Sequence, residues 1–313
     1  MKKEEFYFDS RDNVSKIHAV RWTPDSGNVV AVVQIVHGMA EYVERYEELA
    51  KFLTDRNMVV TGEDHLGHGK TVPEGGIQGY FCEQDPATVV VRDVHRLKKM
   101  TQELYPGVPY FILGHSMGSF ILRNYISRYG TGIDGALLLG SGFQPGANLF
   151  FAKLVLGAEM LCKGPKKVST VLNKMAFGKY NKRLEELKTA YDWLSRNEEN
   201  VAAYIADENC GFIFTTNGFK TLFALIAGAH DKENLEKIPK ELPLYIASGD
   251  MDPVGDYGTG VKKVYQLYEE AGIKDITLQL YPEDRHEILN ESDKEKVMAD
   301  IGEWLAKQLA FHS

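Results

Sequence analysis

The chain has few cysteines and no long uninterrupted apolar run. Its 313 residues include three cysteines, Cys82, Cys162 and Cys210, whose spacing suits neither a metal site nor a redox pair. An odd, sparse set of thiols is typical of a reducing compartment, so we expect free cysteines and a cytoplasmic protein. We expect no signal peptide, because no apolar run follows the two N-terminal lysines. The longest apolar stretch, residues 147–164, contains charged residues and is too short to span a bilayer.

Basic residues are also in the minority. The 36 lysines and arginines are outnumbered by 44 aspartates and glutamates, for a net charge of −8. This balance argues against nucleic acid as a partner. The length allows one large domain, or one domain that carries an insertion.

Strand-like and helix-like segments alternate along the chain. An antiparallel hairpin is predicted at the start, and later runs of β-branched residues predict strands buried on both faces. The predicted strands are residues 4–10, 15–24, 29–38, 58–64, 109–114, 135–141, 242–250 and 276–283. The predicted helices among them are residues 41–57, 86–106, 119–130, 257–271 and 292–310.

Residues 143–235 differ from the rest, because they contain helical patterns and no convincing strand. Strand–helix alternation on both sides of this block predicts an α/β fold, with a mostly parallel eight-stranded sheet flanked by helices. We therefore expect residues 1–142 and 236–313 to form one core domain, into which residues 143–235 are inserted.

A serine lies between two glycines where a predicted strand meets a predicted helix. The motif is Gly-His-Ser-Met-Gly, residues 114–118. This context is typical of a nucleophile elbow, in which a tight, strained turn lifts the serine hydroxyl clear of the sheet. The flanking Gly114 and Gly118 allow neighbouring backbone to approach closely. Ser116 is therefore the candidate nucleophile.

A serine nucleophile needs a base, and the base needs an acid that orients it. The expected chain order is serine, acid, histidine. Among nine histidines, His286 is favoured because it follows the last predicted strand and so lies at the carboxyl edge of the sheet. The acid should follow the strand at 242–250, where spacing leaves Asp250 and Asp252 as equal candidates.

An oxyanion hole requires two backbone N–H groups, each worth about 3 kcal/mol to the transition state. Met117 supplies one candidate, since it follows the nucleophile at a helix N-terminus. Met39 supplies the other, from the loop after the strand at 29–38, where Gly38 lets the backbone turn inward.

Two further motifs are weaker. His65 and His68, within residues 64–71, have no third ligand at a suitable spacing for a metal. Residues 248–260 are rich in glycine but lack the G-x-G-x-x-G pattern of a nucleotide site. We expect neither a metal nor a cofactor.

The inserted block has two apolar and aromatic stretches, residues 149–161 and 210–230. Packed helix faces explain such stretches, but the second holds more phenylalanine than one packed face requires, which suits an acyl pocket. The candidate substrate-binding residues are Gly38, His115, Phe212, Phe214 and Phe219. The basic pairs at 166–167 and 182–183 are either solvated surface or a transient contact with anionic lipid.

Taken together, five segments resemble the lysophospholipase and monoacylglycerol lipase branch of the α/β-hydrolase superfamily. They are VHGMAEYVERYEELAKFL (36–53), DHLGHGKT (64–71), GHSMGS (114–119), SGDMDPVG (248–255) and YPEDRHEILNE (281–291). The resemblance implies the α/β-hydrolase fold and makes the inserted block a cap over the acyl pocket. It also implies Asp252 as the acid, His286 as the base, and Met39 and Met117 as the oxyanion donors.

The expected function is hydrolysis of carboxylic esters of monoacyl lipids, either monoacylglycerols or lysophospholipids, through an acyl-enzyme. Thioesterase, amidase and aminopeptidase activities are alternatives on the same scaffold. An aminopeptidase would need cap carboxylates to hold a substrate amine, for which Glu159, Glu185, Glu186, Asp207 and Glu208 are available. A non-catalytic ligand-binding protein of this fold is the alternative from another class, although such proteins typically lack one member of the triad.

Overall fold

Eight strands form one sheet in the computed structural model, which describes residues 1–144 and 146–311. The strand order is β1-β2-β4-β3-β5-β6-β7-β8. The strands are β1 (Lys2–Asp9), β2 (Lys16–Thr23), β3 (Ala31–Val36), β4 (Met58–Glu63), β5 (Tyr110–His115), β6 (Gly135–Leu139), β7 (Leu244–Gly249) and β8 (Ile276–Tyr281). β2 pairs antiparallel with β1 and β4, and all other neighbours are parallel. The predicted mostly parallel sheet of eight strands is confirmed.

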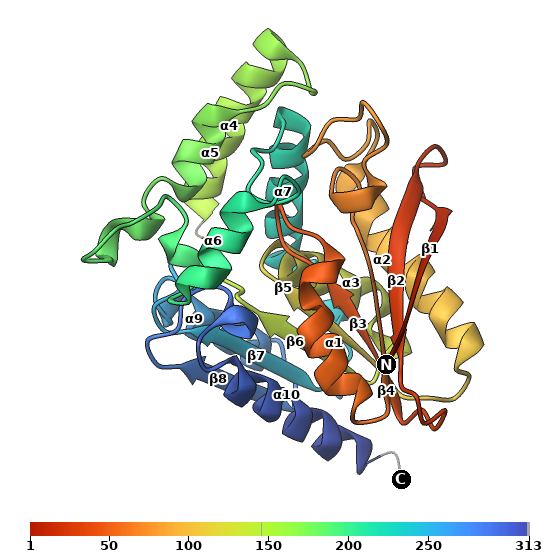
Figure 1. Cartoon of the computed structure of the whole chain (residues 1–313). Helices are drawn as coiled ribbons and strands as arrows, with labels where there is room; N and C mark the ends of the chain where they lie inside the picture. The colour runs from red at the N-terminus through yellow and green to blue at the C-terminus, as the bar shows by residue number, and fades with distance from the viewer. Residues whose placement is uncertain (145, 312–313) are drawn as a thin grey trace.

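The central strands are continuous apolar runs because both faces of the sheet are covered. Every residue of β3, β4, β5, β6 and β7 is buried. One apolar layer lies between the sheet and helices α1 (Glu47–Thr54) and α10 (Lys294–Leu309). The other lies under α2 (Pro86–Leu104), α3 (Met117–Tyr129) and α9 (Thr259–Glu270) (Figure 1). The sheet therefore forms a rigid frame with loops at its two ends.

Between β6 and β7 the chain forms the helical insertion (residues 143–235). Its helices are α4 (Gly146–Lys163), α5 (Thr170–Phe177), α6 (Glu198–Ala206), α7 (Thr216–Ala229) and α8 (Lys232–Lys237). Side chains of Ser169, Asn197, Thr215 and Asp231 cap the N-termini of α5 to α8, which explains where these helices begin. In Figure 1, α4, α5 and α6 stand above the end of the sheet where β5, β6 and β7 finish.

The remaining regular elements are short 3-10 turns. They are η1 (Val43–Tyr46), η2 (Gly69–Thr71), η3 (Gly130–Gly132), η4 (Tyr180–Arg183), η5 (Asp192–Leu194) and η6 (Ile288–Asn290). The helix predicted at 41–57 is thus divided into η1 and α1. Within residues 1–144 and 146–311, no helix has both the length and the apolar character needed to cross a membrane.

Candidate active site

Ser116 occupies the turn between β5 and α3 with a left-handed backbone, φ 53° and ψ −119°. Its N–H donates to Leu139 O at 2.9 Å, which fixes the turn on β6. A Cβ on Gly118 would lie 1.9 Å from Val36 O, and one on Gly114 would lie 2.5 Å from Gly118 O. Gly118 must be glycine because α3 begins directly against the end of β3, and Gly114 must be glycine because the turn brings the backbone of Gly118 back against it. Ser116 is therefore held in a strained conformation, as a nucleophile elbow requires.

His286 and Asp252 form a buried pair beside this turn. Nδ1 of His286 donates to Asp252 Oδ2 at 2.9 Å, and the carboxylate has no exposed surface. The same oxygen accepts from Ser248 Oγ at 2.9 Å, while Oδ1 accepts from Val254 N at 2.8 Å. Asp250, which spacing could not separate from Asp252, instead accepts the N–H of Glu283 at 2.7 Å. Asp252 is thus the aspartate that faces the imidazole.

Ser116 and His286 line the same pocket. A Cβ on Gly140, next to the carbonyl that holds Ser116, would lie 3.0 Å from His286 Cε1. The Ser116 hydroxyl makes no hydrogen bond within the described residues, so it is free to rotate about its Cα–Cβ bond. In enzymes without substrate the contact between nucleophile and base is often long and tightens when substrate binds.

The loop after β3 lies against Ser116. A Cβ on Gly38 would be 3.2 Å from Ser116 Cβ. Met39 follows in this loop, and Met117 begins α3 on the other side of Ser116. Neither of these two N–H groups donates a hydrogen bond within the part of the chain that the structure describes. Two unused backbone donors therefore flank Ser116, which is the arrangement that an oxyanion needs.

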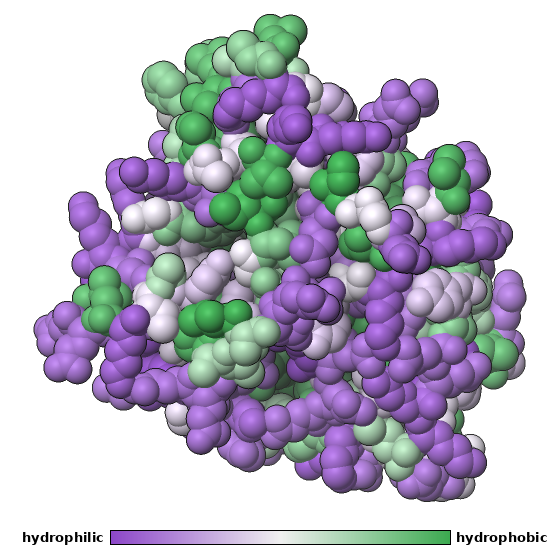
Figure 2. Space-filling model, turned by 45° about the horizontal axis from the view of Figure 1, so that its top comes forward, coloured by the Kyte–Doolittle hydropathy of each residue, from purple (hydrophilic) through white to green (hydrophobic). Residues whose placement is uncertain are grey.

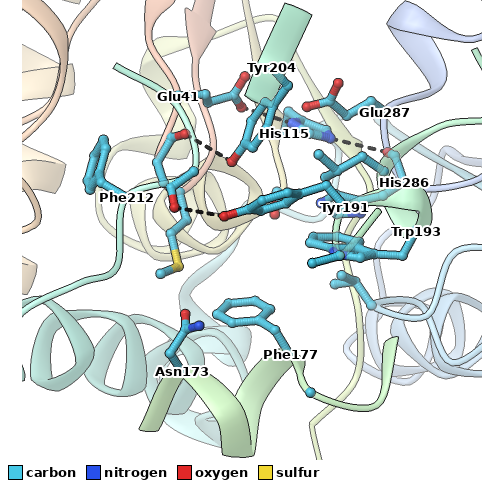
Figure 3. Close-up of a pocket in the computed structure, with 18 of the residues that line it drawn as sticks. Glu41, His115, Asn173, Phe177, Tyr191, Trp193, Tyr204, Phe212, His286 and Glu287 are labelled. Atoms are coloured by element: carbon cyan, nitrogen blue, oxygen red, sulfur yellow. Dashed lines mark hydrogen bonds and ion pairs between the residues drawn. The ribbon is translucent and has the colours of Figure 1, made fainter. Parts of the chain in front are cut away.

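The pocket has a volume of about 320 Å³ and is built from both the core and the helical insertion (Figure 3). Met39, His115, Ser116, Val254 and His286 line it from the core. The insertion contributes mostly apolar and aromatic side chains, among them Phe177, Tyr191, Trp193, Leu194, Tyr204 and Phe212. The size lies at the lower end of the range for ligand pockets, and the lining suits an apolar ligand with one polar end.

Of the three phenylalanines expected to contact substrate, only Phe212 lines the pocket. Phe214 and Phe219 are fully buried. The Phe214 ring packs at 5.3 Å from the His68 ring and 5.6 Å from the Phe81 ring. The expectation is corrected for these two residues, because they pack behind the wall of the pocket and support it.

The sequence did not predict a charged cluster that lines the same pocket as Ser116. Arg45 NH1 donates to Glu41 Oε2 at 2.8 Å, and the same guanidinium reaches both oxygens of Glu287, at 2.7 and 2.8 Å. Glu41 Oε1 accepts from Gly38 N at 2.6 Å. The cluster thereby fixes the loop that carries Met39. Glu41 and Arg45 are four residues apart in the segment for which the sequence predicted a helix, a spacing that could have indicated the first pair, although Glu41 itself lies before η1.

His115 extends this cluster to His286. Its Nδ1 lies 3.1 Å from Glu41 Oε1 and its Nε2 lies 3.2 Å from His286 O. Both partners are acceptors, so the contacts favour the doubly protonated form of the ring. Burial acts to lower the pKa of His115, but the hydrogen bond and charge of Glu41 outweigh it and raise that pKa. The pKa of Glu41 is lowered, since His115 and Arg45 outweigh its own burial. His115 lines the pocket, but its nitrogens are used by the protein.

The histidines of the segment at 64–71 are structural. His65 N donates to His37 Nε2 at 3.0 Å, and the His37 and His65 rings lie 4.0 Å apart. Burial lowers the pKa of both His65 and His68, so both rings are neutral. Among the described residues, no group of three or more His, Cys, Asp or Glu side chains is arranged to hold a metal ion.

The mostly parallel sheet, the strained turn at Ser116 and the Asp252–His286 pair at the carboxyl edge are those of an α/β hydrolase. The chain belongs to the family of serine aminopeptidases, S33, whose model matches residues 27–293.

Several known proteins are similar to this chain over nearly its whole length. It is 29% identical to a monoacylglycerol lipase of Mycolicibacterium smegmatis, over 92% of each chain. It is 28% identical to the monoglyceride lipase of Mus musculus, over 92% of this chain and 86% of that one. A thermostable carboxyl esterase from Bacillus coagulans superposes with a TM-score of 0.91 at 31% identity, over 99% of both chains.

Proposed function

We propose that the protein hydrolyses carboxylic esters of monoacyl lipids, with Ser116 as nucleophile, His286 as general base and Asp252 as the acid that orients it. It is a carboxylic ester hydrolase. The observation that carries the proposal is the strained turn that brings Ser116 into the same pocket as the His286–Asp252 pair. The lipases and the esterase to which the chain is similar support the substrate class.

The reaction follows from the position of these groups. His286 Nε2 takes the Ser116 proton as Oγ attacks the ester carbonyl, and the N–H groups of Met39 and Met117 receive the oxyanion. The tetrahedral intermediate collapses as the imidazolium gives its proton to the leaving alcohol, which leaves an acyl-enzyme. Water then attacks the acyl-enzyme with His286 again as base, and the fatty acid departs. Asp252 keeps the Nδ1 proton in place throughout.

The pocket favours an ester over the substrate of an aminopeptidase. An aminopeptidase needs an unpaired carboxylate for the substrate amine. The acidic residues that line the pocket within the described chain are Glu41 and Glu287; both are ion-paired with Arg45, and Glu41 is also bonded to His115. Asp207, a candidate from the sequence, accepts from Tyr42 OH and does not line the pocket. We infer that the ligand has no cationic group at this end.

A hydrolysis screen tests the proposal directly. The purified protein is given p-nitrophenyl esters of increasing acyl length, monoacylglycerols, lysophospholipids and aminoacyl amides. We expect ester hydrolysis with at least one monoacyl lipid among the best substrates, and aminoacyl amides cleaved at least about 10²-fold more slowly. Preferential cleavage of the amides would contradict the proposal, as would inactivity towards every ester.

We further propose that the helical insertion is a cap domain whose outer surface touches lipid, and that the protein works in the cytoplasm. Residues on α4, α5 and their connection expose large apolar side chains: Phe150, Phe151, Leu154, Leu161, Val168, Val171 and Met175. Figure 2 shows hydrophobic residues gathered at the end of the molecule where α4 lies, with hydrophilic ones around them.

The same part of the insertion is rich in basic residues. Between 146 and 183 the only acidic residue is Glu159, against eight basic ones, Lys153, Lys163, Lys166, Lys167, Lys174, Lys179, Lys182 and Arg183. In a chain of net charge −8, this local excess suits an anionic membrane surface.

Replacing Phe150, Phe151 and Leu154 together by serine should weaken binding to vesicles that contain phosphatidylglycerol by about tenfold or more, since each side chain loses its apolar burial in lipid. Co-sedimentation with vesicles measures the effect, and binding should also fall with added salt. The matched control is Leu104→Ser, at an exposed apolar site on α2 outside the insertion, which should bind like the original protein. Equal binding by the triple variant would rule out this surface.

A further inference from the structure

The loop that carries His286 depends on the helical insertion for its shape. The histidine loop (residues 282–291) joins β8 to the last helix, and the bridge segment (residues 192–197) lies beside it. His286 N donates to Trp193 O at 3.4 Å, and Glu287 N donates to Leu194 O at 2.7 Å. The backbone on both sides of the imidazole is therefore bonded to the insertion.

Glu291 joins these two segments. Its carboxylate has no exposed surface. It accepts from Arg285 N at 2.8 Å, directly before His286. From the bridge segment it accepts the Ser195 hydroxyl at 3.0 Å and the N–H of Arg196, which lies 3.1 and 3.0 Å from its two oxygens. One buried side chain thus satisfies donors from both segments at once.

Two arginines around Glu291 also join the histidine loop to the bridge segment. The Arg196 guanidinium reaches from the bridge segment to Asp284 and, at 3.0 Å, to Asp293. In the opposite direction, Arg285 NH1 donates to the carbonyl of Asp192 at 2.6 Å and to that of Ser195 at 3.1 Å. Burial, followed by the charges of Glu291 and Asp293, raises the pKa of Asp284 to about 7. Arg196 is ion-paired with both Asp284 and Asp293.

The imidazole itself also contacts the bridge segment. The Trp193 ring lies 5.1 Å from the His286 ring, and the Phe177 and Tyr180 rings pack on Trp193 at 6.1 and 4.9 Å. In Figure 3, Trp193 lies next to His286 at the edge of the pocket. A displacement of the bridge segment would therefore displace the ring of the base and the backbone beneath it.

We propose that Glu291 is a positioning residue, which makes the bridge segment of the helical insertion part of the frame that orients His286. Asp252 sets the direction of Nδ1, and Glu291 sets the position of the loop from which the imidazole projects. This role rests on the proposed function, since it requires His286 to act on Ser116. A misplacement of about 1 Å at a reacting group costs about 10²-fold in rate.

The test compares Glu291→Gln with Asp293→Asn. Glutamine keeps the size but turns one acceptor into a donor that faces N–H groups. For p-nitrophenyl acetate we expect Glu291→Gln to lower kcat by about 10²-fold with KM changed much less. The low-field proton resonance of the His286–Asp252 hydrogen bond should shift or disappear. Asp293→Asn removes a half-exposed partner of Arg196 and should keep the resonance and a kcat within about threefold.

A milder variant covers the case in which Glu291→Gln does not fold. Ser195→Ala removes one donor to Glu291, and we expect a folded protein with kcat lowered about five- to tenfold and a shifted resonance. Unchanged kcat and resonance in the folded variants would overturn the proposal. If the proposed function is wrong, the unsubstituted protein will cleave no ester. The proton resonance will still report the position of His286 in each variant, so the two failures can be told apart.

Discussion

Replacing Ser116 by alanine is expected to abolish ester hydrolysis, with a loss of about 10⁶-fold in kcat. The hydroxyl makes no hydrogen bond within the described residues, so its removal should leave the fold and the melting temperature almost unchanged. The positive φ at this position is as unfavourable for alanine as for serine, so the two proteins carry the same backbone strain. Initial rates on a p-nitrophenyl ester, with circular dichroism as the check on folding, measure the effect.

The matched control is Ser127→Ala, in the same helix α3. Its hydroxyl donates to Asn124 O at 2.8 Å and is buried away from the pocket. This variant should lose about 1 kcal/mol of stability and keep its activity. If Ser116→Ala stayed active while Ser127→Ala did not, the assignment of the nucleophile would be wrong.

The second large effect concerns the acid. Asp252→Asn should lower kcat by about 10⁴-fold, because an amide cannot hold the Nδ1 proton of His286 and favours the wrong tautomer. Asp250→Asn should cost much less, since within the described residues the Asp250 side chain accepts a single hydrogen bond, from the turn N–H of Glu283. Steady-state kinetics of both variants on one ester, at one pH, make the comparison.

Both aspartates follow β7, so the two variants control for each other. The resemblance noted in the sequence and the contact of Asp252 with His286 lead to the same ranking. A larger loss from Asp250→Asn than from Asp252→Asn would reverse the assignment.

The sheet was predictable because its strands are strongly patterned. The runs in β3 and β5 are apolar on both faces, which marks strands covered on two sides, and a helical pattern follows each of them. The elbow was predictable for a local reason, since Gly114 and Gly118 are required by contacts within one turn and with β3. Sequence reveals such features because a few neighbouring residues determine them.

Features that depend on distant contacts were not predictable from the residues alone. Asp250 and Asp252 differ in which partner each meets across the loops, Glu283 or His286. The junction at Glu291 joins segments nearly a hundred residues apart, and its sequence shows only an acidic residue in a polar loop.

The lining of the pocket shows the same limit. Phe212 faces the pocket, while Phe214, two residues later, is fully buried. An abundance of aromatic residues indicates an apolar environment, but only the packing of the insertion on the core decides which rings face substrate. Trp193 and Tyr191 had no local signal, because they reach the pocket from the short turn η5 and the residue before it.

The central claim is that Ser116 is a nucleophile activated by His286, and covalent labelling tests it most directly. A fluorophosphonate probe, which reacts with activated serines, is added to the protein and the modified peptide is identified by mass spectrometry. We expect a single adduct, on Ser116, that forms far more slowly in His286→Ala. Labelling of another serine, or an unreactive Ser116 in a protein that is folded, would contradict it.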